Sequence, residues 1–173
     1  MTSPQRVVVD VSIAQAAGGL GALASESRTC TSILEALRDH GCFVVTCDEW
    51  LTEWHRHRSR YSYQWLSSMF ARRKVRKVSL SAAQALHNCV VGKTSPTSRA
   101  TVMKDIYLIC ASFAADRRIL SLDEEVRNLL KGVGSACPRL CDILWANPMN
   151  DAESVLGWIA AGLPFEADRS LCV

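Results

Sequence analysis

Two carboxylates in this sequence follow short apolar segments, and each has a hydroxyl group two residues away. Asp10 comes directly after three valines and is followed by Ser12, while Asp123 comes two residues after Ser121. Consecutive β-branched residues are typical of buried strands in parallel sheets, and ligands bind beyond the carboxyl ends of such strands. Asp is also a favoured helix cap. At this point Asp10 is therefore equally well interpreted as a ligand-binding residue or as a cap.

Two predicted helices contribute further acids. Glu53 borders the apolar stripe of a helix that begins near residue 47, and Asp105 precedes the apolar face of a helix predicted at 99–115. Gathered carboxylates raise each other's pKa unless a cation is present, and oxygen ligands favour Mg²⁺ or Mn²⁺. Such a centre activates water and offsets charge on a phosphodiester. Glu49 could exchange roles with Glu53, but Thr46-Cys47-Asp48-Glu49 is typical of a capping box, which would engage Glu49.

The order of elements predicts the α/β class. Strands are expected at the N-terminal valines, at 42–46, at 119–122 and at 142–145, with helices between them and a loop at 92–98. This alternation favours a three-layer α/β/α fold with a central parallel sheet of about four or five strands. Residues 1–148 would form the main domain. Residues 149–173 would add a helix and tail, either within that domain or as an accessory element.

Charge is unevenly distributed along the 173 residues, although the net charge is only +3. The segment from residue 54 to residue 104 contains eleven Lys or Arg and no Asp or Glu, whereas the rest contains nine basic and seventeen acidic residues. This separation predicts one basic surface and a separate acidic site. A basic surface attracts polyanions through counterion release, although a solvated face that serves solubility is the alternative interpretation.

The eight cysteines do not make a clear framework. Because several lie in apolar runs and no secretion signal is recognised, we expect reduced thiols and a cytoplasmic protein rather than a disulfide framework. Cys137 and Cys141 have the spacing of half a zinc site, but no second pair accompanies them. No apolar run is long enough for a membrane span, so we expect no membrane partner. The five tryptophans are expected mostly in the core.

Taken together, the motifs resemble the PIN domain family, the metal-dependent ribonuclease fold, over roughly residues 6–148. The matching pieces are Asp10-Val11-Ser12, Leu51-Thr52-Glu53-Trp54, Lys104-Asp105-Ile106-Tyr107 and Ser121-Leu122-Asp123. The resemblance implies a ribonuclease that cleaves single-stranded or structured RNA with metal-activated water. By that resemblance Asp10, Glu53, Asp105 and Asp123 would be the catalytic metal ligands for Mg²⁺ or Mn²⁺. Ser12 and Ser121 would support them.

The expected partner is RNA, held by basic residues of the acid-free segment. Those residues are Arg56, Arg58, Arg60, Arg72, Arg73, Lys74, Arg76, Lys77, Arg99 and Lys104. Many relatives of this family are toxins of bacterial toxin–antitoxin pairs, so the resemblance also implies inhibition by a cognate antitoxin protein. A second copy of the chain, forming a homodimer, is considered as a further partner.

Two other classes of protein compete with this interpretation. The first is a catalytically silent PIN-like protein that binds RNA or acts as a scaffold. The second is a receiver-type phosphotransfer domain, which would need paired acids at the first strand and an Asp after the second. Val9 precedes Asp10 and Cys47 follows Thr46, so the second alternative fits poorly.

Overall fold

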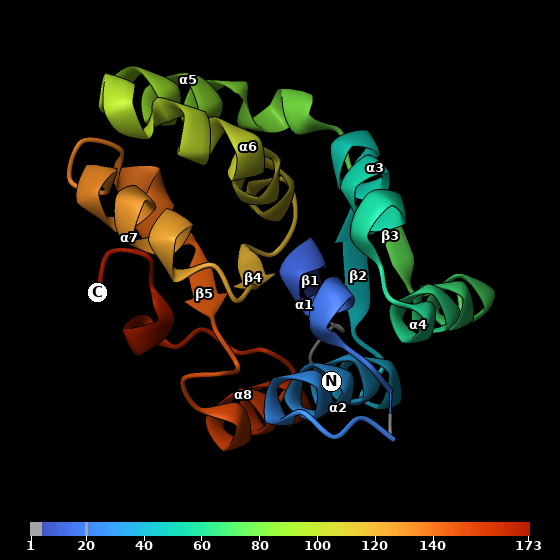
Figure 1. The fold of residues 1–173 in the computed structure, drawn as a ribbon. Coiled ribbons are helices and arrows are strands. Elements are labelled where there is room, and N and C mark those ends of the chain that lie inside the picture. Colours follow the sequence, from blue (N-terminus) through green and yellow to red (C-terminus); the bar gives the residue numbers. More distant parts are fainter. Residues whose placement is uncertain (1–4, 20) are drawn as a thin grey trace.

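The computed structural model describes residues 5–19 and 21–173. Its centre is a parallel sheet with the strand order β3-β2-β1-β4-β5 (Figure 1). The strands in the described part are β1 (Arg6–Val9), β2 (Phe43–Thr46), β3 (Val75–Lys77), β4 (Arg118–Leu120) and β5 (Leu144–Ala146). Because every neighbouring pair is parallel and helices connect them, the predicted three-layer α/β/α class is confirmed.

Helices cover both faces of this sheet (Figure 1). They are α1 (Val11–Ala16), α2 (Ser25–Asp39), α3 (Asp48–His57), α4 (Arg60–Ala71), α5 (Gln84–Lys93), α6 (Pro96–Phe113), α7 (Glu124–Val133) and α8 (Ala152–Ala160), with 3-10 turns η1 (Leu80–Ala83), η2 (Pro138–Asp142) and η3 (Ala167–Arg169). Helices α5, α6 and α7 pack together, and α6 contacts β1, β2 and β4. Helix α2 contacts α1, α4 and α8, which form the other layer.

The valines of β1 explain why this strand is central. Val7, Val8 and Val9 are all fully buried, because strands pair with β1 on both edges and helices cover both faces. Val8 is in register with Ile119, and the N–H of Asp10 donates to the carbonyl of Leu120 at 2.8 Å. The ends of β1 and β4 therefore lie side by side, at the edge of the sheet where Asp10 emerges.

Two parts of the predicted element pattern were wrong. Strand β3 was not predicted, because Val75-Arg76-Lys77 continues a run of basic residues; charged side chains are nevertheless common on edge strands, where β3 lies. The loop predicted at 92–98 shrinks to Thr94 and Ser95 between α5 and α6. Pro96 occupies the first turn of α6, where its missing N–H costs no helical hydrogen bond.

Residues 149–173 belong to the same folded body as the rest of the chain. Trp158 and Ile159 of α8 are buried in the common core, and α8 packs on α2. The tail returns to β5, where the N–H of Leu171 donates to the carbonyl of Ile143 at 3.0 Å. Asp151 caps α8, accepting from the N–H of Ser154 at 2.9 Å. Residues 149–173 therefore pack against the core that the preceding elements form.

Four of the eight cysteines form disulfides, so the expectation of reduced thiols throughout is wrong. Cys89 of α5 is bonded to Cys137, and Cys141 of η2 is bonded to Cys172 in the tail. Cys137 and Cys141 belong to different disulfides, which agrees with the absence of a second pair that would complete a zinc site. Their partners lie 48 and 31 residues away in the chain, and no local spacing rule connects them. The remaining four are free and buried: Cys30, Cys42, Cys47 and Cys110.

Large aromatic side chains fill the core, as predicted for the tryptophans. All five are no more than 2% exposed, and Trp50 and Trp54 stack with ring centroids 4.4 Å apart. The indole N–H of Trp50 donates to the carbonyl of Val9 at 2.6 Å, which fixes α3 against the end of β1. Within the described residues, no helix has the length and apolar character needed to cross a membrane.

Candidate functional site

Asp10 is a buried carboxylate held by two hydroxyl groups. It is 4% exposed, and its Oδ2 accepts from Ser12 Oγ and from Ser121 Oγ, each at 2.6 Å. Although Asp10 occupies the position before α1, its side chain accepts no hydrogen bond from that helix. The interpretation as a helix cap is therefore wrong. The two serines instead aim a charged group into the space beyond the strand ends.

The two serines join the ends of β1 and β4. Ser12 Oγ accepts from the N–H of Leu122 at 3.2 Å, and Ser121 Oγ accepts from the N–H of Asp123 at 3.0 Å. Asp123 caps α7 through Oδ1, which accepts from the N–H of Val126 at 2.9 Å. Asp123 is thus both a cap and a site residue, and its orientation is fixed by α7.

The four acids predicted from the sequence line one pocket of about 150 Å³. They come from the ends of β1 and β4 and from helices α3 and α6, and are Asp10, Glu53, Asp105 and Asp123. Ser12, Gln15, His57 and Lys104 complete much of the wall. Even so, no three His, Cys, Asp or Glu side chains in the described ranges are grouped closely enough to hold a metal ion.

Glu53 is engaged by its own helix. Its two carboxylate oxygens contact Arg56 at 3.1 Å and His57 at 3.4 Å. His57 lines the acidic pocket as well, because one helical turn separates it from Glu53. The predicted capping box at Thr46–Glu49 is wrong: Thr46 belongs to β2, and Cys47 precedes α3. Glu53 rather than Glu49 nevertheless lines the pocket with the other three acids.

Asp105 responds to burial and to the neighbouring charges. Burial and, next, the negative charge of Asp10 together raise its pKa to about 6, while Lys104 opposes both effects. The hydroxyl of Tyr107, two residues further along α6, also has a raised pKa because of burial and the nearby carboxylates. Both shifts indicate a concentration of negative charge with too little compensation from the protein itself.

The raised pKa of Asp105 predicts that Asp105→Asn stabilises the metal-free protein. The carboxyl group of Asp105 has a pKa of about 6 in the folded protein and an ordinary pKa of about 3.9 in the unfolded chain. The free energy of unfolding therefore falls as the pH rises between those two values. Above pH 6 the full cost of ionising it in the folded protein remains. We expect Asp105→Asn to raise the free energy of unfolding by about 1–2 kcal/mol at pH 7.5, after allowance for partial solvent screening.

Urea denaturation in EDTA at pH 7.5 and pH 4 measures this effect. The difference between Asp105→Asn and the wild type should shrink towards zero at pH 4, where the wild-type carboxyl carries a proton in the folded protein. Asp168→Asn, at an exposed position in η3, serves as the control and should change stability little. A loss of stability in Asp105→Asn at pH 7.5 would contradict the assignment of Asp105 to a charge-strained cluster.

The predicted basic surface is divided by the fold. Lys74 lies at the start of β3, where its Nζ donates to the carbonyl of Gly41 at 2.9 Å and lies over the Phe43 ring. Arg72 and Arg73 immediately precede it, at the amino ends of the strands. Asp10 lies at the carboxyl end of β1. Arg72, Arg73 and Lys74 therefore lie away from the carboxylates, at the opposite ends of the strands.

The other basic residues differ in what they contact. Several already have partners: Arg56 pairs with Glu53, Arg58 covers Tyr63, Arg76 covers Phe43, Lys77 pairs with Asp48, and Arg99 donates to the carbonyl of Thr94. Arg60 is exposed at the start of α4. Lys104 is the residue of the predicted set that lines the acidic pocket, and it forms no ion pair within the described part of the chain.

The donor set suits a hard divalent cation in its chemistry. All four acids and both serines offer oxygen, which Mg²⁺ and Mn²⁺ prefer. Asp10 Oδ1 accepts no hydrogen bond from a described residue, so one oxygen of this buried carboxylate is free for a ligand. Bringing Glu53 to a shared ion would require its side chain to leave Arg56 and His57. The pocket residues therefore fit Mg²⁺ or Mn²⁺ by the chemistry of their oxygen donors.

Comparison with known proteins identifies no relative: no family model, no curated protein and no solved structure matches this chain. The resemblance to PIN domains stays a prediction from motifs. The geometry supplies a pocket where four carboxylates meet beside one cation, Lys104, at the carboxyl ends of β1 and β4. The oxygen donors of this pocket are of the kind that a divalent cation prefers.

Proposed function

We propose that this protein is a divalent-metal-dependent ribonuclease whose active site is the acidic pocket. The observation that carries the proposal is the convergence of Asp10, Glu53, Asp105 and Asp123 from four separate elements onto one pocket. Acidic residues that are far apart in the sequence normally face solvent. Four carboxylates that line one pocket, one of them buried, imply a ligand of opposite charge. RNA is the proposed substrate because the motifs at these four positions resemble those of a ribonuclease family.

The residues of the pocket would divide the work. Asp10 would be the fixed ligand, because two serine hydroxyls restrain its Oδ2 while Oδ1 remains accessible to a cation. Asp123, restrained by its capping bond to Val126, would be a second fixed ligand. Glu53 and Asp105 would be the adjustable ligands on helices. Mg²⁺ or Mn²⁺, when bound, would supply an activated water and neutralise the phosphate charge.

Lys104 would hold the substrate phosphate. It lies one residue before Asp105 and lines the same pocket, so a phosphate that reaches the carboxylates passes its ammonium group. His57 is placed to exchange protons near Glu53, with its Nε2 at 3.4 Å from Glu53 Oε2.

The direct test is cleavage of a fluorescent single-stranded RNA by the purified protein. We expect cleavage with Mn²⁺ or Mg²⁺ and none with excess EDTA, and restored cleavage when the metal is added back. Cleavage that ignores EDTA would contradict the metal-dependent mechanism. A parallel single-stranded DNA of the same sequence tests whether the 2′-hydroxyl is recognised.

Lys104→Ala should weaken RNA binding and flatten its salt dependence. Loss of one phosphate contact reduces the slope of log affinity against log salt by about 1. Arg72→Ala removes one charge at the amino ends of the strands and is the matched control; it should leave metal-dependent cleavage close to the wild-type rate. Fluorescence anisotropy across a salt series measures the slope. Equal effects of the two substitutions on cleavage would contradict the assigned position of the phosphate.

One observation favours a second candidate function, an RNA-binding or scaffold protein without catalysis. Glu53 is already paired with Arg56 and His57, and no three potential ligands of the described residues are grouped for a metal ion. A silent protein would bind RNA equally well with Mn²⁺ or EDTA and would not cleave it. The cleavage experiment above therefore separates the two functions.

A further inference from the structure

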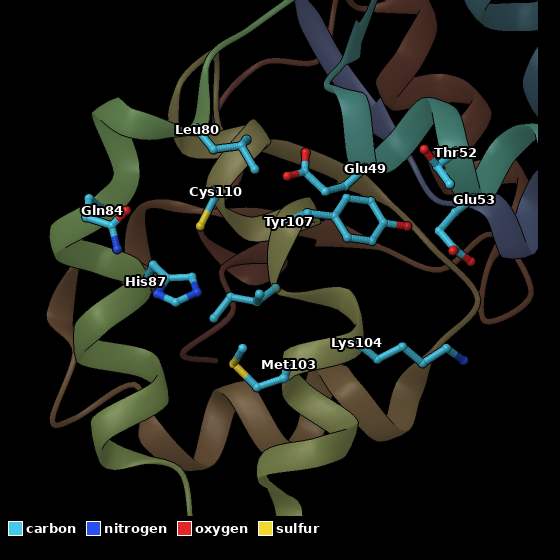
Figure 2. Close-up of a pocket in the computed structure, with 11 residues that line it drawn as sticks. Glu49, Thr52, Glu53, Leu80, Gln84, His87, Met103, Lys104, Tyr107 and Cys110 are labelled. Carbon is cyan, nitrogen blue, oxygen red and sulfur yellow. The ribbon is translucent and has the colours of Figure 1, made fainter.

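A second cavity of about 530 Å³ adjoins the acidic pocket (Figure 2). It lies between α3 on one side and η1 and α5 on the other, with α6 as its floor. Glu53 and Lys104 line both spaces, so the two are neighbours along one surface. The volume falls in the range of about 300–1,000 Å³ that is typical of small-ligand sites. The roles proposed above leave this cavity without an occupant.

Tyr107 provides the first sign that a polar ligand binds in this cavity. Tyr107 is only 6% exposed, yet its hydroxyl has no hydrogen-bond partner in the described part of the chain. Figure 2 shows the ring among the cavity residues, with the hydroxyl directed towards Glu53. A buried hydroxyl without a partner costs about 1–3 kcal/mol, so a ligand that pairs with it gains that energy on binding.

The walls combine apolar surface with a few polar groups. Leu80 and Met103 contribute apolar surface, while Gln84 and His87 of α5 face Glu49 of α3 across the cavity (Figure 2). Glu49 forms no ion pair within the described residues, so its carboxylate is available as a hydrogen-bond acceptor. A flat ring with polar edges matches such a lining better than an aliphatic chain or a second phosphate does.

We propose that this cavity holds a guanine base of the RNA, in the nucleotide next to the phosphate bound at the acidic pocket. The inference rests on the proposed ribonuclease function. A carboxylate only accepts hydrogen bonds, and guanine alone among the four bases presents two adjacent donors, N1–H and the 2-amino group. Glu49 can pair with both, in the manner of a bidentate contact. The acceptor edge of guanine then faces the amide of Gln84 and the ring of His87.

The other bases satisfy Glu49 less well. Uracil offers one N–H between two carbonyl oxygens, and these oxygens would be repelled by the carboxylate. Adenine and cytosine each offer one amino group beside a ring nitrogen that accepts. A base with only one donor at this edge leaves one oxygen of the Glu49 carboxylate without a partner, so we expect guanine to bind more tightly than the other bases.

The cavity can be tested without catalysis by measuring binding of the four uncharged ribonucleosides in EDTA. Isothermal titration calorimetry should give guanosine the highest affinity, by about 10-fold or more over uridine, adenosine and cytidine. Glu49→Gln should remove most of this preference, whereas Glu125→Gln, at an exposed position on α7, should leave it intact. Equal affinities for the four nucleosides would overturn the proposal.

Tyr107→Phe provides a second variant that keeps the ring and its packing. Because the hydroxyl has no partner in the protein, its removal should not lower stability, but it should weaken guanosine binding about 5- to 10-fold. Tyr63→Phe, at a residue that is 50% exposed on α4, is the matched control. Unchanged guanosine affinity in Tyr107→Phe together with Glu49→Gln would overturn the proposal even if the wild type binds guanosine.

Cleavage of an RNA with a single guanine then connects the cavity to the acidic pocket. We expect metal-dependent cuts beside that guanine, and cuts spread over other positions in Glu49→Gln. Cleavage without guanine preference would overturn the inference and leave the ribonuclease function intact. Guanosine binding by a protein that never cleaves RNA would overturn both the ribonuclease function and the assignment of the base to an RNA substrate.

Discussion

Asp10→Asn is expected to abolish metal-dependent RNA cleavage while leaving the fold intact. The amide oxygen can still accept from Ser12 and Ser121, so the hydrogen bonds that join β1 to β4 are retained. The substitution, however, removes the negative charge that the proposed mechanism needs at this buried, pocket-lining position. We expect a decrease in rate of more than about 100-fold, beyond the roughly 10- to 100-fold effect of residues that only orient a ligand.

Three measurements on Asp10→Asn separate loss of chemistry from loss of structure. Single-turnover cleavage with Mn²⁺ gives the rate, circular dichroism and urea denaturation report the fold, and calorimetric titration with Mn²⁺ gives the metal affinity. Asp168→Asn, an exposed acid in η3, is the matched control and should retain wild-type values. Near wild-type cleavage by a folded Asp10→Asn protein would contradict the proposed role of this carboxylate.

Reduction of the two disulfides is expected to destabilise the protein strongly. Cys89–Cys137 ties α5 to the turn before η2, and Cys141–Cys172 ties the tail beside β5. Each closes a segment of tens of residues, and a native disulfide of that kind contributes about 2–4 kcal/mol to stability. Urea midpoints with and without a phosphine reductant measure the loss. The double variant Cys89→Ser/Cys137→Ser should lose only the part that this bond contributes.

The thiol count checks the pairing itself. Burial raises the pKa of Cys30 to about 12 and those of Cys47 and Cys110 to about 11, so these thiols should resist iodoacetamide in the native protein. After denaturation without reductant, mass spectrometry should find four alkylated cysteines, and eight after reduction. Eight alkylated cysteines without reductant would contradict both disulfides. Disulfides persist in oxidising compartments and are rare in cytosolic proteins.

Local sequence patterns located most of the elements and all four acids of the pocket. The valines before Asp10 predicted a buried strand, and the structure gives β1 at Arg6–Val9 at the centre of the sheet. Such patterns depend on neighbouring residues and were therefore readable. They failed where tertiary contacts decided the outcome, as at β3, whose basic residues are ordered by pairing with β2.

The basic segment illustrates the same limit. Its net charge is a property of the sequence, but chain direction through α4 and β3 carries Lys74 to one end of the sheet, while α6 brings Lys104 to the other. The charge composition therefore predicted one basic surface, whereas the fold distributes these basic residues over separate parts of the molecule. His57 and Tyr107 were missed as site residues for a similar reason, since neither has a distinctive local pattern.

By itself, the sequence determined the α/β alternation, the positions of the acids at strand ends and on helix faces, and the aromatic core, because these follow from side-chain type and periodicity. Only the tertiary structure decided that Ser121 meets Asp10 across 111 residues of chain, and that Glu53 turns towards its own helix. It also decided which cysteines pair and that a second cavity adjoins the carboxylates. Strand register and helix crossovers set these contacts, and both are fixed by packing of the whole chain.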